Sequence, residues 1–124
     1  MNLYEETLVE LSENGKTLKD VIAICGKDFQ ITIEDFIRCS NTEYDKGYGA
    51  PEVATDLLVI GDDFWLERHD YDGLEWWEFK TMPKYKDMPF KSITALTARQ
   101  AKKIGWETLA DLNKEEIKNK EVQG

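Results

Sequence analysis

Apolar residues near the start of the chain recur at the spacing of an amphipathic helix. Over residues 2–13 the apolar stripe consists of Tyr4, Leu8 and Leu11, and Gly15 follows as a helix stop. The pattern therefore predicts a first helix over residues 2–13, with one face turned toward a core.

Two threonines further along have the spacing of helix N-caps. Thr32 precedes Asp35 by three residues and opens an apolar stripe, so we expect a helix over Ile33–Ser40. Thr17 precedes Asp20 in the same way, but the residues after Thr17 allow two interpretations. Leu18, Val21, Ile22 and Cys25 stand at helical spacing, whereas the run AICGKDFQI is equally compatible with an extended chain after Ile22.

From Asp56 the apolar period changes from helical to two, which is typical of strands. Gly61-Asp62 and Asp72-Gly73 are favourable two-residue hairpin turns, so residues 56–80 are predicted to form a three-stranded antiparallel meander. The second turn pairs Tyr71 with Leu74, His69 with Trp76, Glu67 with Glu78 and Leu66 with Phe79. The first turn pairs Val59 with Phe64, Leu58 with Trp65, Leu57 with Leu66 and Asp56 with Glu67.

This register gives the meander two different faces. One face is apolar and predicts a core on which the helices pack; it consists of Leu57, Val59, Phe64, Leu66, Trp77 and Phe79, with Arg68 near its end. The other face aligns Asp56, Glu67 and Glu78 in one row, flanked by Trp65 and Lys80 on one side and by His69 and Trp76 on the other. Like charges opposite each other cost a few tenths to about 1 kcal/mol per pair. Gln in place of Glu67 or Glu78 is therefore expected to leave stability unchanged or to improve it.

The remaining segments complete an α+β fold. Residues 44–55 are a glycine-rich loop, and residues 90–96 are compatible with a further strand. Thr97 has the position of an N-cap for a helix over 98–104 that ends at Gly105. Trp106, Leu109 and Leu112 indicate a short closing helix before a polar tail. We predict a single domain over residues 1–124, with an antiparallel meander at about 56–80, possible extension of the sheet by 90–96, and N-terminal helices packed against it.

Charge and cysteine usage restrict the function classes. Residues 1–80 carry 19 acidic and 7 basic side chains, a balance of −12, whereas residues 81–124 have a balance of +3. The acidic part repels phosphate, which argues against direct nucleic-acid binding and favours a partner protein with a basic surface. Cys25 and Cys39 end the runs VIAIC and FIRC, whose apolar residues favour small buried thiols over a disulfide or a reactive site. We therefore expect a cytoplasmic protein without a signal peptide or a membrane span. One histidine and two scattered cysteines do not make a zinc set, so we predict no metal and no cofactor.

Two hypotheses from different classes follow for the mixed face. The first is a non-enzymatic binding or inhibitor protein that contacts its partner through Asp56, Trp65, Glu67, His69, Trp76 and Glu78, because large aromatic side chains are enriched at interfaces. The alternative is a small hydrolase or metal-dependent enzyme that uses the carboxylates Asp56, Glu67 and Glu78 with His69 as a general base. The sequence favours the first hypothesis, since no nucleophile stands near His69 in the chain and a 124-residue domain leaves little room for a substrate groove.

The run YDKGYGAPEVATDLLVIGDDFWLERHDYDGLEWWEFKTMP, and its part DFWLERHDYDGLEWWEF above all, resembles a segment of small acidic proteins from Gram-positive bacteria and their phages and mobile elements. The resemblance covers residues 44–83, about a third of the chain. It transfers no catalytic or binding residue. It implies only a biological setting: small acidic accessory proteins of mobile elements are often inhibitors of host machinery, including defence nucleases that handle nucleic acid.

Overall fold

The computed structural model describes residues 1–45 and 49–114. Its contacts form two compact units, Met1–Pro83 (unit 1) and Lys84–Gly124 (unit 2). The contacts thus divide the chain more finely than the single domain predicted for residues 1–124. The boundary falls in the proline-broken connector, where residues 82–84 form no regular element.

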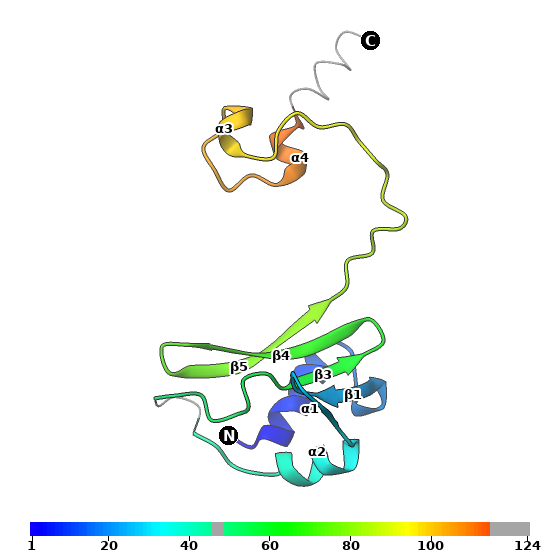
Figure 1. The fold of residues 1–124 in the computed structure, drawn as a ribbon, viewed down its shortest axis with the longest axis vertical. Coiled ribbons are helices and arrows are strands. Elements are labelled where there is room, and N and C mark those ends of the chain that lie inside the picture. The colour runs from blue at the N-terminus through cyan, green and yellow to red at the C-terminus, as the bar shows by residue number, and fades with distance from the viewer. Residues whose placement is uncertain (46–48, 115–124) are drawn as a thin grey trace. The chain divides into compact units, whose positions relative to one another are not determined.

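Unit 1 is a five-stranded antiparallel sheet with two α-helices, so the predicted α+β class is confirmed (Figure 1). The strand order is β2-β1-β3-β4-β5, which places β5 at one edge and β2 at the other. In chain order the elements are α1 (Leu3–Glu13), the single 3₁₀ turn η1 (Leu18–Asp20), β1 (Val21–Cys25), β2 (Gln30–Ile31), α2 (Ile33–Ser40), β3 (Leu58–Gly61), β4 (Phe64–Tyr71) and β5 (Leu74–Thr81).

The helices of unit 1 begin at capped residues. The side chain of Asn2 accepts a hydrogen bond from the N–H of Glu5 at the start of α1, and Thr32 accepts one from Asp35 at the start of α2. Each bond occupies one of the N–H groups that a helix start leaves without an intrahelical acceptor. The bounds predicted for both helices are confirmed, to within one residue for α1.

The segment after Thr17 forms a strand, and the helical interpretation of Leu18–Cys25 is wrong. Thr17 and Asp20 do form the reciprocal capping box, but it closes only the single turn η1. The chain then extends as β1, which pairs with β2 and β3; Val21 and Ile24 are in the core, while Ile22 is exposed. A register irregularity between Val21 and Ala23 accounts for the broken alternation.

The β4–β5 hairpin has the predicted register throughout, from Tyr71 opposite Leu74 to Leu66 opposite Phe79. The β3–β4 hairpin does not. Its turn is Asp62-Asp63, so that Val59 lies opposite Leu66 rather than Phe64. Gly61 is the last residue of β3, and a Cβ atom there would lie 1.9 Å from Cε1 of the Phe64 ring. The glycine is thus required for close packing against the ring and not for the turn itself.

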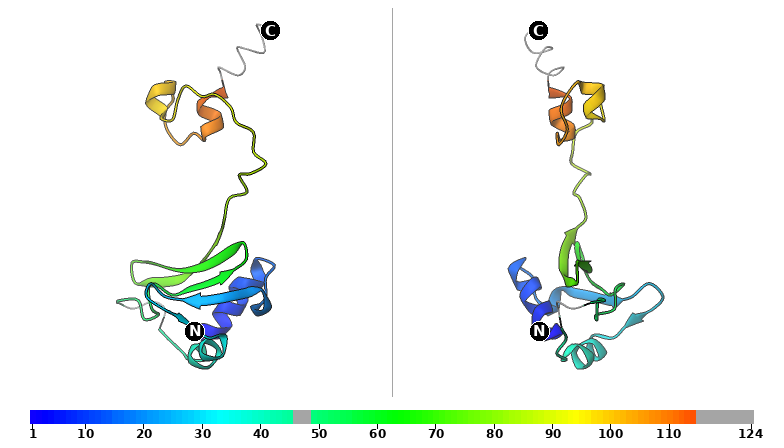
Figure 2. Two further views of the ribbon diagram at one scale, coloured as in Figure 1. Left: turned by 45° about the vertical axis from the view of Figure 1, so that its right-hand side comes forward. Right: turned by 90° about the vertical axis from the view of Figure 1, so that its left-hand side faces the viewer.

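The shift moves each β3 pairing by two residues, which leaves every side chain on the face predicted for it. The core therefore forms as expected, with Val59, Phe64, Leu66 and Trp77 buried and Leu57 and Phe79 packed beside them. Leu3 and Leu11 of α1 and Phe36 of α2 belong to the same cluster, so both helices cover this one face of the sheet (Figure 2).

Unit 2, of which residues 84–114 are described, has two one-turn helices, α3 (Ala98–Ala101) and α4 (Leu109–Leu112). The N-cap at Thr97 is confirmed, but α3 ends at the left-handed Lys102 and not at Gly105. The strand considered for 90–96 is absent from the described structure. Instead, the N–H groups of Thr94 and Ala95 donate to Oδ1 of the buried Asn113, at 3.0 and 3.1 Å, which removes them from strand pairing. The predicted tail lies outside the described residues from 115 onward.

The four tryptophans provide a matched test of the core. Trp77 is 4% exposed, whereas Trp106 of unit 2 is fully exposed. Trp77→Ala is expected to lower the free energy of unfolding of unit 1 by about 3–5 kcal/mol, because it opens a core cavity. Trp106→Ala should change it by less than about 0.5 kcal/mol. Denaturant midpoints of the two variants, read from the far-UV signal of the sheet, check this. Equal effects would contradict the core assignment.

Candidate functional site

The face of the sheet opposite the helices carries a repeated sequence pattern. On β4 the residues are Trp65, Glu67 and His69, and on β5 they are Trp76, Glu78 and Lys80, so each strand presents a tryptophan, a glutamate and a cationic or titratable residue at alternate positions. Because the strands are antiparallel and Glu67 lies opposite Glu78, the two triplets are related by an approximate two-fold axis between the glutamates. We call the surface formed by these six residues, with Leu58 and Ile60 of β3, the open face.

Glu67 is held by two donors on its own strand. The indole Nε1–H of Trp65 donates to its Oε1 at 2.7 Å, and His69 Nε2 lies 2.8 Å from its Oε2. The hydrogen bond from Trp65, followed by the one with His69, lowers the pKa of the Glu67 carboxyl below its usual value. The carboxylate is therefore ionised at neutral pH and already has partners within the face.

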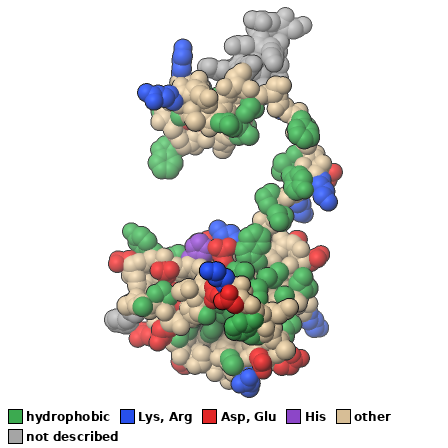
Figure 3. All heavy atoms as spheres, in the orientation of Figure 1, with side chains coloured by type: hydrophobic (Ala, Val, Ile, Leu, Met, Phe, Trp, Pro, Cys, Tyr) green, Lys and Arg blue, Asp and Glu red, His purple; other side chains and the backbone are tan. Residues whose placement is uncertain are grey.

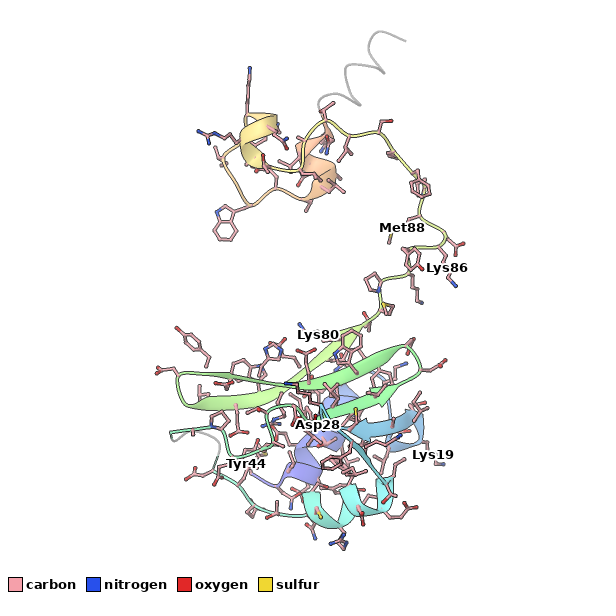
Figure 4. The ribbon with its side chains drawn as sticks, viewed as in Figure 1. Lys19, Asp28, Tyr44, Lys80, Lys86 and Met88 are labelled. Carbon is pink, nitrogen blue, oxygen red and sulfur yellow. The ribbon has the colours of Figure 1, made fainter. Side chains whose placement is uncertain are left out.

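Glu78 has the equivalent arrangement on β5. Lys80 Nζ lies 3.1 Å from Glu78 Oε2, and the indole of Trp76 donates to Glu78 Oε1 at 3.3 Å. The bond from Lys80, followed by the one from Trp76, lowers the pKa of Glu78. His69 connects the two triplets, because its Nε2 is also 3.6 Å from Glu78 Oε2 and its ring stacks on Trp76. Figure 4 labels Lys80 on β5 at the end of this arrangement.

Asp56 does not belong to the carboxylate row, and its predicted pairing with Glu67 is wrong. Leu58 occupies the position opposite Glu67, as a result of the two-residue shift in β3. Asp56 instead lies by the β1–β2 turn, where its Oδ2 accepts a hydrogen bond from the N–H of Lys27 at 2.7 Å. The structure thus brings together five of the six predicted contact residues, Trp65, Glu67, His69, Trp76 and Glu78, and separates Asp56 from them.

The open face combines partly exposed aromatic rings with acidic ends. Trp65 and Trp76 are half-buried, and their N–H groups are occupied by the glutamates, so the rings present apolar surface. Exposed aspartates stand in the turns at both ends of the face: Asp62 and Asp63 between β3 and β4, and Asp72 between β4 and β5. Figure 3 shows further acidic side chains spread over the visible side of unit 1. This arrangement suits a partner surface with positive charge around an apolar centre.

A second polar cluster lies on the core side and was not predicted. The side chain of Arg68 is 3% exposed, and its guanidinium lies 2.8 Å from Glu75 Oε1 and 3.4 Å from Glu6 Oε1. It also donates to the Tyr44 hydroxyl at 3.2 Å and lies 4.7 Å from the centroid of the Trp77 ring. One cation therefore joins α1, the segment after α2, β4 and β5.

The carboxylate of Glu75 anchors the loop before β3. Burial alone would raise its pKa, but hydrogen bonds from the N–H of Glu52, from Arg68 and from the N–H of Val53 outweigh burial and lower the pKa. Burial, together with the hydrogen bond that Tyr44 donates to Glu6, raises the pKa of Tyr44 to about 12. The sequence signals for this cluster were Arg68 at a core-facing position and Glu75 on the same face of the predicted hairpin, whereas Glu6 and Tyr44 are distant in the chain.

The described residues, 1–45 and 49–114, include no group of three or more His, Cys, Asp or Glu side chains arranged to hold a metal ion. No helix among them is long and apolar enough to cross a bilayer. Comparison of the chain with protein-family models, with curated proteins and with solved structures gave no match. The resemblance to small acidic proteins of mobile elements therefore stays a prediction.

The hydrogen bonds of Glu67 reverse the expectation that Gln at this position is harmless. Since its folded-state pKa is lowered, the ionised carboxylate adds stability above its unfolded pKa, and that contribution is lost as the pH falls through the folded pKa. Glu67→Gln should therefore be less stable than the parent at pH 7, with the difference shrinking toward pH 3. Denaturant midpoints at both pH values measure this, with Glu13→Gln, an exposed glutamate of α1, as the control for loss of a carboxylate. A Glu67→Gln protein more stable than the parent at pH 7 would restore the original expectation.

Arg68 should be essential for the stability of unit 1. Arg68→Ala leaves the buried carboxylates of Glu6 and Glu75 without their cation, which costs about 3–5 kcal/mol for a buried pair. Arg38→Ala, which removes an exposed arginine paired with Asp35 on α2, should cost less than about 1 kcal/mol. Chemical denaturation of both variants distinguishes the two cases. Similar midpoints would show that the cluster is not a stabilising contact.

Proposed function

We propose that this chain is a non-enzymatic binding protein whose open face docks on a basic surface of another protein. The observation that carries the proposal is the pair of half-buried tryptophans, Trp65 and Trp76, held on a rigid strand pair between acidic turns. Aromatic side chains with low conformational freedom are typical anchors of interfaces. The balance of −12 over residues 1–80 selects against acidic partners and nucleic acid, and accelerates encounters with basic ones.

The paired glutamates support binding rather than catalysis. Each carboxylate already accepts an indole hydrogen bond and lies beside His69 or Lys80, so both glutamates are engaged in contacts within the face. The low pKa of both groups is also unsuited to a general acid at neutral pH. The enzymatic alternative needs Asp56 in the same site, and Asp56 lies by another turn.

The proposal extends to a biological setting. The resemblance of residues 44–83 to small acidic proteins of phages and mobile elements favours a host protein that handles nucleic acid, such as a defence nuclease, as the partner. Such an enzyme presents a basic surface to phosphate, and an acidic protein that occupies this surface inhibits it. We place this interaction in the cytoplasm, where nucleases of this kind meet invading DNA.

The test is affinity purification from a lysate of a Gram-positive host, with mass spectrometry and then titration of the purified partner. Trp65→Ala should weaken binding by at least about tenfold, while Phe29→Ala, which removes an exposed aromatic ring in the β1–β2 turn, should not. Binding should also weaken as the salt concentration rises. Denaturant midpoints confirm that both variants fold. A partner bound equally well by Trp65→Ala and at high salt would sink the proposal.

A further inference from the structure

The edge of the sheet at β5 offers unpaired backbone groups. β5 is eight residues long, whereas β2 at the opposite edge has two, and very short edge strands protect themselves from pairing. A long edge strand is a template for a further strand unless something covers it.

The hairpin turn fixes which groups face outward. Asp72 and Gly73 have φ values of 51° and 85°, the conformation of a two-residue type I′ turn, in which the flanking Tyr71 and Leu74 form a hydrogen-bonded pair. Hydrogen-bonded and non-bonded pairs alternate along an antiparallel ladder. Leu74, Trp76, Glu78 and Lys80 therefore bond to β4, and the backbone groups of Glu75, Trp77, Phe79 and Thr81 point to the free edge. Within residues 1–45 and 49–114 those outward groups have no hydrogen-bond partner.

A groove lies between α1 and β5, where Trp76 and Trp77 form its β5 side. It has a volume of about 310 Å³ and is lined by Met1, Glu5, Glu6, Val9, Glu10, Trp76 and Trp77. Trp76 belongs to the open face and Trp77 to the core face, so the groove spans the edge of the strand between them. Val9 is 55% exposed although it lies beside a strand, which leaves an apolar position on the helical wall.

The helical wall of the groove is acidic. Glu5, Glu6 and Glu10 all line it. Arg68 pairs with Glu6 from the core side, and the N-terminal ammonium of Met1 pairs with Glu43 at 3.0 Å. The exposed Glu5 therefore contributes the clearest negative charge to the wall. A strand added to β5 places alternate side chains toward this wall and toward Trp76. Positive side chains at the positions that point toward α1 meet Glu5, and those that point the other way lie against the indole of Trp76, where a cation over an aromatic ring is also favourable.

We propose that the groove between α1 and β5 binds an extended peptide segment rich in lysine or arginine, which pairs with β5 as a sixth strand of the sheet. The inference takes the positive charge of the partner from the proposed function, but assigns a different contact surface. In this binding mode the backbone hydrogen bonds supply affinity, and the wall of α1 selects the charge.

The experiment uses the full chain and a capped decapeptide of alternating lysine and valine. Amide hydrogen exchange is measured by NMR with and without the peptide. In the free protein the amides of Trp77 and Phe79 should exchange fast while those of Trp76 and Glu78 are protected, and the peptide should protect Trp77 and Phe79 as well. The same peptide N-methylated at alternate residues, or with glutamate in place of lysine, should give no protection.

Matched variants on α1 test the acidic wall. Glu5→Lys should weaken peptide binding by about tenfold or more, whereas Glu13→Lys, the same change on the same helix outside the groove, should leave it within about twofold. Val9→Lys should also abolish binding, since it places a cation at the apolar position. Equal affinities of the Glu5→Lys and Glu13→Lys proteins would overturn the acidic-wall assignment.

Two further outcomes would overturn the peptide site. Amides of Trp77 and Phe79 that are already protected in the free protein, with a dimer mass in sedimentation, would show that a second copy occupies the edge. Absence of peptide protection, while capture of the partner still depends on Trp65, would refute this inference and leave the proposed function standing. The converse, peptide protection with capture independent of Trp65, would support the groove and refute the open face.

Discussion

The fold of unit 1 depends on one buried cation. Arg68 lies between the carboxylates of Glu6 and Glu75, beside the hydroxyl of Tyr44 and against the ring of Trp77. Burying a guanidinium is costly unless its donors are paired; both terminal nitrogens of Arg68 have partners, whereas its Nε has none among the described residues. These partners have to come together as the core forms. The helix α1 and the segment after α2 are thereby fixed against the sheet in one arrangement. The same contact sets the position of α1 along β5, and with it the shape of the groove at that edge.

The open face shows how an acidic protein places two glutamates side by side without strain. In each strand the indole two residues before the glutamate donates to it, and the residue two positions after it supplies a cation or an imidazole. Antiparallel pairing then brings the two triplets together, with each carboxylate already in contact with neighbours on its own strand. The negative charge that remains is concentrated in the turns and on the helices, where solvent surrounds it. Recognition of a basic partner by this face would depend on aromatic contact at the centre and on electrostatics at the rim.

Local signals predicted the parts of the structure that depend on neighbouring residues. The N-caps at Thr17, Thr32 and Thr97 form as the spacing indicated, and Asp72-Gly73 makes the predicted turn. Both faces of the meander were also predicted, because alternation survives a two-residue shift in register. The position of Asp56 was not, since it depends on the register of β3, in which Gly61 packs closely against the Phe64 ring instead of forming the turn, and no periodicity encodes that contact.

Contacts between distant residues account for the rest. Glu75, 7 positions from Arg68, is its diagonal neighbour in the predicted β4–β5 register, but Tyr44 and Glu6 lie 24 and 62 positions away, and no spacing rule connects them. β1 has the same apolar spacing as a helix, and only its neighbours β2 and β3 decide in favour of a strand. The groove at β5 requires both the order of the strands and the position of α1, neither of which a single segment contains.

Unit 2 is held together in a different way, which affects how it responds to heat and denaturant. Ala95 is the only buried apolar residue among its described residues, whereas Asn113 accepts hydrogen bonds from two backbone N–H groups and donates to two carbonyl oxygens. Heat capacity and denaturant sensitivity both follow the apolar area exposed on unfolding. Loss of structure in unit 2 would therefore be broad, with little heat-capacity change, and calorimetry of the full chain would report almost entirely on unit 1.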